Sequence, residues 1–153
     1  MTAWPQGIVV TINDTADPQF REQIHEAIKA FNDDSSPVHR EARITGTQPL
    51  DIILRDGNGR LIGGLMANTY WGWLDVDNLW LHEDYRGRGL GSRMLQTAEK
   101  EARRRGCQRA FLKTFSFQAP EFYREHGYQI AGRLDDYPPG QSFLWMVKEL
   151  AAI

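Results

Sequence analysis

The sequence predicts an α/β protein built on a mixed β-sheet with helices on both faces. Runs of β-branched and apolar residues, each of strand length, alternate with longer stretches whose apolar residues recur every three or four positions. Three strand-like runs follow one another through tight turns, and a strand–helix–strand unit comes after them, so antiparallel and parallel pairing are combined. The length of 153 residues is that of one domain, and we expect residues 1–153 to form a single one.

The N-terminal part should hold a strand and a helix. Ile8–Ile12 is a short β-branched run and is expected to be the first strand. Asp14–Asp17 offers helix caps, and Pro18 suits the first position of a helix. The apolar stripe of this helix would consist of Phe20, Ile24, Ala27, Ile28 and Phe31. Segment 39–49 is compatible with a short helix or with a loop.

The rest of the chain supplies the remaining strands and two more helices. The tight turns are Asp56–Gly59 and Trp71–Trp73, which join neighbouring strands as hairpins. The elements expected in order are strands Leu50–Arg55, Leu61–Thr69 and Leu74–His82, a helix from Leu90 to Gly106, strand Arg109–Phe115, a helix Ala119–His126, and strands Tyr128–Leu134 and Ser142–Leu150.

The composition excludes several classes of protein. The net charge is -2 and the pI is about 6.1, which does not suit a general nucleic-acid binder. No apolar run approaches the length of a membrane span, and the N-terminus lacks the pattern of a signal peptide. Cys107 is the single cysteine, so an internal disulfide and a cysteine zinc cluster are excluded. We expect a cytoplasmic protein without metal, nucleic-acid partner or membrane contact.

The segment Leu79–Arg93, LWLHEDYRGRGLGSR, carries the strongest functional signal. It consists of the end of an apolar strand, a short acidic turn, a loop of glycine and arginine, and the first turn of a helix. Glycines let the backbone approach an anion closely, and the following helix adds the positive end of its dipole. Such a loop suits a pyrophosphate, with Arg86 and Arg88 adding positive charge.

Two other phosphate motifs fit this loop poorly. It lacks the Gly-Lys-Ser/Thr ending of the P-loop. Its glycines, Gly87, Gly89 and Gly91, follow the spacing GxGxG instead of the GxGxxG of dinucleotide-binding proteins, and the next strand ends without an acidic residue. A nucleotide-binding module of another fold is therefore disfavoured.

Two motifs together resemble the GNAT family of N-acetyltransferases, in its bacterial small-molecule branch. Residues 86–91, RGRGLG, match the R/Q-x-x-G-x-G/A loop of that family, and residues 119–128, APEFYREHGY, are similar to its later A-x-x-F-Y-x-x-x-G-F/Y element. The resemblance implies the family's acyl-CoA N-acyltransferase fold, a mixed sheet of about seven strands splayed between the fourth and fifth. It also implies an enzyme that transfers acetyl from acetyl-CoA to a primary amine of a small molecule by direct attack.

The resemblance implies a set of residues that bind acetyl-CoA (coenzyme A). The family's asparagine before the second motif is replaced by Ser116, and Gln118 stands close enough to substitute for it. The backbone of the strand before the loop would pair with the pantetheine arm, and the loop amides would bind the pyrophosphate. The implied residues are Trp80, Leu81 and His82 on the strand, Arg86, Gly87, Arg88, Gly89, Leu90, Gly91 and Ser92 in the loop and helix start, and Ser116, Ala119, Phe122 and Tyr123.

The chemistry requires an acid for the departing thiolate and a base for the incoming amine. Tyr123 matches the tyrosine that commonly supplies the proton, although it could instead only pack against the sulfur end of the cofactor. An alkylamine arrives protonated, so a base or a water chain must deprotonate it. The candidate carboxylates are Asp75, Asp77 and Glu83. Asp77 is the favoured base, Glu83 comes next, and His82 could also serve at neutral pH. Solvated surface acids are the alternative for each carboxylate.

The acceptor is expected at the hairpin before the loop. Tyr70, Trp71 and Trp73 stand there with Asp75, and aromatic faces beside carboxylates suit a cationic or partly aromatic amine. Packing of the hairpin explains the same aromatic residues without a substrate. Two other functions stay open, an acetyl-CoA-binding regulatory domain without turnover and a protein N-terminal or lysine acetyltransferase. The family is often dimeric, which makes a homodimer possible.

Overall fold

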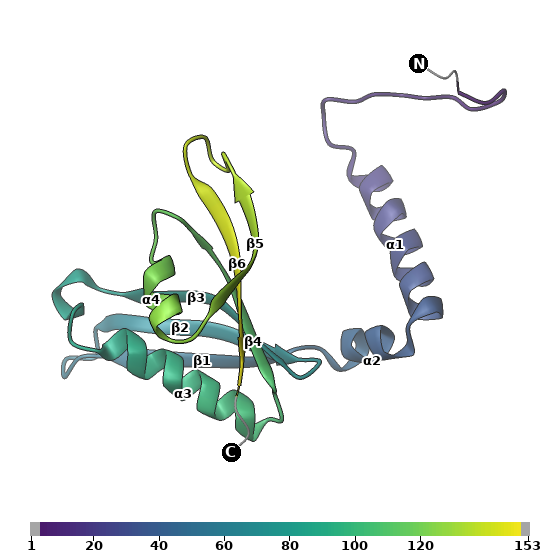
Figure 1. Ribbon diagram of the computed structural model, residues 1–153. Coiled ribbons are helices and arrows are strands. Elements are labelled where there is room, and N and C mark those ends of the chain that lie inside the picture. Colours follow the sequence, from purple (N-terminus) through teal and green to yellow (C-terminus); the bar gives the residue numbers. More distant parts are fainter. Residues whose placement is uncertain (1–3, 151–153) are drawn as a thin grey trace. The chain divides into compact units, whose positions relative to one another are not determined.

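The computed structural model describes residues 4–150. They form two compact units that divide between Ile44 and Thr45 (Figure 1). The first unit contains two helices. The second contains the whole β-sheet and the two helices that connect its strands. No helix in residues 4–150 is long and apolar enough to cross a membrane.

The first unit holds helices α1 (Pro18–Ser35) and α2 (Pro37–Thr45). Pro18 begins α1 as expected, and Asp17 caps it, since its Oδ1 accepts hydrogen bonds from the backbone N–H of Gln19 at 2.9 Å and of Phe20 at 3.2 Å. The segment that the sequence left open is helical, as α2. The caps and the apolar spacing thus predicted α1 correctly.

The expected strand Ile8–Ile12 does not form. These residues have no partner strand within the described part of the chain, and their side chains are exposed. A β-branched run becomes a strand only when a neighbouring strand completes its ladder, because β-propensity reflects packing on a sheet more than a backbone preference. The sheet therefore has six strands instead of about seven.

The second unit is a single sheet in the order β1-β2-β3-β4-β6-β5. Only β3 and β4 run parallel, and every other neighbouring pair is antiparallel. The mixed sheet predicted from the sequence is confirmed. Its elements are β1 (Gln48–Arg55), β2 (Leu61–Tyr70), β3 (Trp73–Leu81), the 3-10 turn η1 (Glu83–Tyr85), α3 (Leu90–Arg104), β4 (Arg109–Phe115), α4 (Pro120–Glu125), β5 (Gln129–Asp135) and β6 (Ser142–Glu149).

The core of the second unit lies between α3 and one face of the sheet. Met94, Leu95, Ala98 and Ala102 form an apolar stripe at helical spacing along α3, and each is at most 2% exposed. They pack against inward side chains of the strands, among them Leu74. This packing fixes the first turn of α3 at the same end of the sheet as the end of β3.

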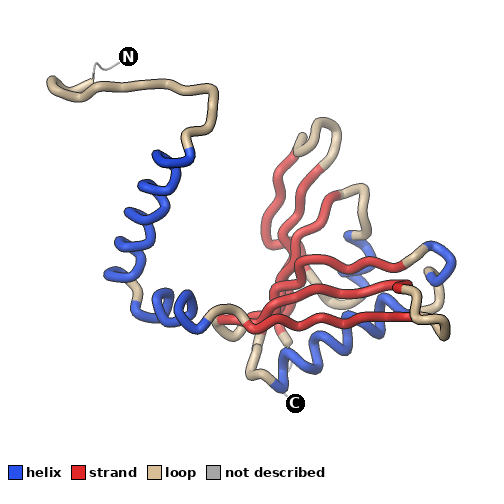
Figure 2. Tube along the Cα trace, turned by 180° about the vertical axis from the view of Figure 1, so that it is seen from behind, coloured by secondary structure: helices blue, strands red, loops and turns tan. Residues whose placement is uncertain are grey.

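The two halves of the sheet separate at one end. β3 and β4 pair only as far as Val76 and Leu112, although β3 continues to Leu81 and β4 to Phe115. Figure 2 shows the two groups of strands running apart from this point, with β1, β2 and β3 on one side and β5 and β6 rising on the other. The splay that the resemblance implied between the fourth and fifth strands is present, between β3 and β4.

A β-bulge on β3 sits at the same point. Met66 of β2 pairs with Asn78 and Ala67 pairs with Val76, so Asp77 is an extra residue without a partner on β2. The bulge reverses the alternation of side chains along β3. Before it the even-numbered Leu74 and Val76 are buried, and after it the odd-numbered Leu79 packs against the core. It also bends β3 away from β4, which opens the sheet.

Candidate functional site

A cleft of about 740 Å³ lies where β3 and β4 separate. Its walls come from the splayed end of β3, the glycine loop with the first turn of α3, the end of β4, and α4 with the loop before it. The residues that line it are Asp77, Asn78, Leu79, Trp80, Leu81, Arg86, Gly87, Gly89, Leu90, Gly91, Ser92, Lys113, Thr114, Phe117, Gln118, Ala119, Phe122 and Tyr123. Two stretches of the chain, residues 77–92 and 113–123, thus build one concave site.

The glycine loop offers backbone donors to this cleft. Gly87 and Gly89 have φ angles of 71° and 73°, in the left-handed region that favours glycine. Gly89 is the residue before α3, and no side chain caps the helix there. The first N–H groups of a helix have no partner within it, and the residues that carry them here, Leu90, Gly91 and Ser92, all line the cleft, where such groups suit an anion.

The two loop arginines lie differently. Arg86 lines the cleft, and its Nε donates a hydrogen bond to the carbonyl oxygen of Leu81 at 3.0 Å, which ties the loop to the end of β3. Arg88 is outside the cleft lining, and its guanidinium lies 5.5 Å from the centre of the Tyr85 ring. Arg86 is therefore the arginine that adds positive charge to the site.

The β3 wall begins earlier than the sequence suggested. Asp77 and Asn78 line the cleft together with Trp80 and Leu81, whereas His82 does not. The backbone N–H of His82 donates to the carbonyl of Ile62 at 2.8 Å, so it is already committed to β2. The bulge explains this shift, because it frees the backbone at residue 77 and the ladder with β2 resumes after it.

The α4 wall brings Phe122 and Tyr123 into the cleft. Phe122 packs against the first turn of α3, since a Cβ added to Gly91 would stand 3.5 Å from its ring. Burial raises the pKa of the Tyr123 hydroxyl above its ordinary value. Tyr123 therefore holds its proton throughout the neutral range, as an acid must.

Of Ser116 and Gln118, only Gln118 lines the cleft, in keeping with the substitution that the sequence allowed. Ser116 is outside the cleft lining, and its Oγ donates to Gln141 Oε1 at 2.6 Å and accepts from the N–H of Ser142 at 3.0 Å. Gln118 lines the cleft, and its Oε1 accepts from Thr114 Oγ1 at 3.0 Å. Ser116 thus holds the last hairpin, and Gln118 is the polar side chain at the site.

The three candidate carboxylates are separated by the fold. Asp77 lies in the cleft lining with Tyr123, and Glu83 lies outside it, exposed in η1. Asp75 is also outside the lining, where its Oδ2 accepts a hydrogen bond from Tyr70 at 3.1 Å. Burial, followed by the nearby charge of Asp77, raises the pKa of Asp75, while the Tyr70 hydrogen bond opposes this.

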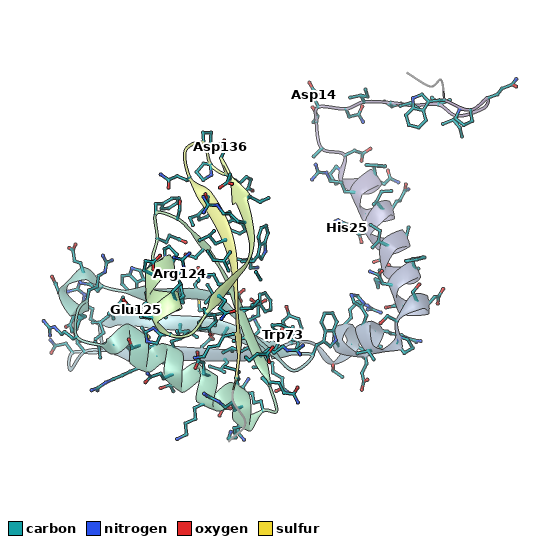
Figure 3. The ribbon with its side chains drawn as sticks, in the orientation of Figure 1. Asp14, His25, Trp73, Arg124, Glu125 and Asp136 are labelled. Atoms are coloured by element: carbon teal, nitrogen blue, oxygen red, sulfur yellow. The ribbon has the colours of Figure 1, made fainter. Side chains whose placement is uncertain are left out.

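The predicted acceptor aromatics line a second cavity. Tyr70, Trp71 and Trp73 surround about 330 Å³ of almost wholly apolar space together with Phe111, Trp145 and Val147. Trp73 begins β3, and Figure 3 shows it well apart from Arg124 and Glu125 of α4, the helix that carries Tyr123. The structure does not bring these aromatic side chains into the cleft, so their role with a substrate stays a prediction.

Five residues of the cleft escaped the sequence analysis. Asn78, Leu79, Lys113, Thr114 and Phe117 all line it. Lys113 and Thr114 close β4, opposite the bulge, and no motif marks them. The end of a parallel strand beside a splay is the signal that could have found them, since ligands bind at the carboxyl ends of such strands.

The polar groups of the cleft suit acetyl-CoA. The uncapped start of α3 and Arg86 suit a pyrophosphate. The open edge of β3 between Asp77 and Leu81 offers unpaired backbone groups to an extended amide-bearing arm. When bound, acetyl-CoA would supply an activated thioester.

A test of the loop uses two glycines in matched conformations. Gly89→Ala and Gly59→Ala should each lose about 1 kcal/mol of stability, because both glycines have left-handed φ angles and an added Cβ meets nothing within 4 Å. Only Gly89→Ala should weaken coenzyme A binding, by about tenfold. Calorimetric titration and thermal denaturation measure the two effects. Equal coenzyme A affinity in both variants would contradict the loop's role.

Sequence and structure comparisons agree with this geometry. A sequence profile described as the acetyltransferase (GNAT) family matches residues 12–128. The chain is 41% identical over 130 residues to a blasticidin-S acetyltransferase of Streptomyces morookaense, covering 80% of this chain and 96% of that protein. It also resembles the crystal structure of an acetyltransferase from Bacillus cereus, with 30% identity, a TM-score of 0.77, and coverage of 92% of this chain and 98% of the other.

A more distant relative shares the fold. A Bacillus anthracis protein solved in complex with acetyl coenzyme A is 18% identical, with a TM-score of 0.59 over 69% of this chain and 65% of that one. The splayed sheet, the glycine loop at the start of α3 and the family match over most of the sequence lead to one conclusion. This chain belongs to the GNAT family and is an acetyl-CoA-dependent N-acetyltransferase.

Proposed function

We propose that this enzyme acetylates a primary amine of a small cationic molecule, with Asp77 as the base and Tyr123 as the acid. The observation that carries the proposal is that both side chains line the cleft that also contains the glycine loop. Glu83, the other candidate base, is exposed outside it. One cleft therefore combines an anion cradle, a carboxylate and a protonated phenol.

Each group in the cleft has a separate role in the reaction. The Asp77 carboxylate receives a proton from the ammonium form of the acceptor, which gives the neutral amine that can attack a carbonyl carbon. The free N–H groups along the splayed edge of β3 stabilise the negative charge that develops on the carbonyl oxygen. Tyr123 Oη holds a proton that can pass to a departing thiolate. Phe122 and Leu79 exclude water from the inner end of the cleft.

The acceptor should be cationic. Asp77 lies close enough to Asp75 on β3 for its negative charge to raise the pKa of Asp75, whereas the positive charge of Lys113 lowers it. A relative carries the name blasticidin-S acetyltransferase, which supports an amine-bearing antibiotic as the acceptor class. A small molecule is thereby favoured over a protein N-terminus or a lysine side chain.

The test is release of coenzyme A thiol from acetyl-CoA in the presence of pooled amines, blasticidin S included. Asp77→Asn should lower kcat about a hundredfold with the best acceptor, because it removes the base. Glu83→Gln is the matched control, and it should leave the rate unchanged because its carboxylate is outside the cleft. Cofactor binding without thiol release from any amine would favour a regulatory domain over an enzyme that acts on small amines.

We also propose a single catalytic domain, a cytoplasmic location and a homodimer. The family profile spans residues 12–128, across both compact units, which supports one functional domain. Cys107 is buried and free, in keeping with a reducing compartment. Light scattering of the purified chain measures its mass, and a monomer at micromolar concentration would contradict the dimer.

A further inference from the structure

A row of three polar side chains crosses the sheet and ends at Asp77. Thr47, just before β1, donates its hydroxyl to Asn68 Oδ1 at 3.2 Å. Asn68, on β2, donates its Nδ2 to Asp77 Oδ2 at 2.9 Å. Each contact joins one strand segment to the next, so the row follows the sheet from its edge to the cleft.

The direction of these hydrogen bonds is fixed by chemistry. A carboxylate only accepts, so the amide nitrogen of Asn68 must face Asp77. The Thr47 hydroxyl can donate, and its contact with Oδ1 holds the amide in that orientation. We propose that Asn68, oriented by Thr47, is a positioning residue that holds Asp77 Oδ2 and leaves Oδ1 for the acceptor amine. This inference rests on the proposed role of Asp77 as the base.

The bulge makes such a partner necessary. Asp77 is the extra residue on β3, without a ladder partner on β2, and its side chain is exposed. An unpaired residue at the mouth of a cleft has several accessible rotamers, and only some direct the carboxylate to the acceptor. Asn68 stands opposite Asp75 in the ladder and reaches diagonally to Asp77. The contact selects one orientation of the Asp77 carboxylate.

The titratable groups around Asp77 come from four elements. Asp75 on β3 and Tyr70 at the end of β2 interact electrostatically with it. Lys113 of β4 and Tyr123 of α4 line the same cleft. Asn68 differs from these groups because it holds the Asp77 carboxylate through a direct hydrogen bond and adds no charge.

The experiment compares kcat and KM for Asn68→Ala, Thr47→Val and Thr47→Ser. Asn68→Ala should lower kcat about three- to tenfold, because the carboxylate loses the hydrogen bond that orients it. Thr47→Val keeps the shape and removes the hydroxyl, and it should lower kcat by a smaller factor. Thr47→Ser restores the hydroxyl and should restore kcat. The KM for acetyl-CoA should not change in any variant.

A substrate-free measurement separates this inference from the proposed function. NMR scalar couplings across the Cα–Cβ bond of Asp77 should report one side-chain rotamer in the unchanged protein and an average over several rotamers in Asn68→Ala, whether or not an acceptor has been found. An unchanged Asp77 rotamer and an unchanged kcat in Asn68→Ala, with Asp77→Asn inactive, would overturn the positioning role alone. Full activity of Asp77→Asn would overturn both the base assignment and this inference.

Discussion

Tyr123→Phe should lower kcat by about a hundredfold or more while coenzyme A still binds with nearly unchanged affinity. The substitution removes only the hydroxyl, and general acid catalysis contributes about a hundred- to ten-thousandfold. The ring still fills its place among Phe122 and Tyr128, whose centroids lie 5.1 Å and 6.0 Å away. Thiol release and calorimetric titration with coenzyme A measure the two quantities. If kcat stayed within twofold, Tyr123 would only pack against the cofactor.

The pH dependence of the unchanged enzyme checks the same assignment. Burial raises the pKa of Tyr123, so the phenol keeps its proton until the pH exceeds the ordinary tyrosine value of about 10. The raised pKa makes Tyr123 a weaker acid, but the same burial also raises the pKa of a thiol beside it. The rate should therefore show no loss from tyrosine ionisation between pH 7 and about 9. A basic limb that vanishes in Tyr123→Phe within that range would contradict the retained proton.

Lys148→Met should destabilise the fold by about 3 kcal/mol. Lys148 of β6 donates to both carboxylate oxygens of Glu99 on α3 at 2.8 Å, and the Glu99 side chain is only 4% exposed. Removing the lysine leaves a buried carboxylate whose remaining cation, Arg103, is 3.9 Å away. A buried charge without a close partner is costly. Urea denaturation followed by circular dichroism measures the loss.

The partner variants give the matched controls. Glu99→Gln should cost less than Lys148→Met, because the side chain of Lys148 is 22% exposed and its ammonium can reach water. The double variant Glu99→Leu with Lys148→Met should recover most of the lost stability, since an apolar pair replaces a buried ion pair at little cost. Equal losses of stability in the two single variants would contradict the prediction that leaving Glu99 unpaired costs more than leaving Lys148 unpaired.

Local patterns predicted the elements that depend on neighbouring residues. The cap at Asp17, the proline at the start of α1 and the stripe of α3 all act within one or two helical turns, so the sequence contains the whole cause. β4 was predicted with its observed bounds, Arg109–Phe115, because a glycine turn precedes it and its alternation is regular. Ile8–Ile12 was predicted wrongly because a strand depends on a partner that the local sequence does not specify.

The same contrast between local and long-range causes applies to the residues of the site. The glycine spacing and the second motif identified the loop, Phe122 and Tyr123, since each is a contiguous segment with its own chemistry. The sequence favoured Asp77 over Glu83 as the base, but spacing alone could not place either side chain, because Asp77 lies within β3 and Glu83 follows the end of that strand. The bulge, a property of the pairing between β2 and β3, places Asp77 in the cleft and leaves Glu83 outside it.

The sequence by itself determined the mixed α/β class, the order of the elements of the sheet unit and the anion-binding loop, because these follow from short-range periodicity and backbone freedom. Only the tertiary structure decided that six strands pair, that Asp77 and Tyr123 share a cleft while Trp73 lines another cavity, and that Asn68 holds Asp77. Each of these depends on strand register and on where β3 leaves β4. Contacts between residues far apart in the chain set both, and such contacts leave no periodic trace in the sequence.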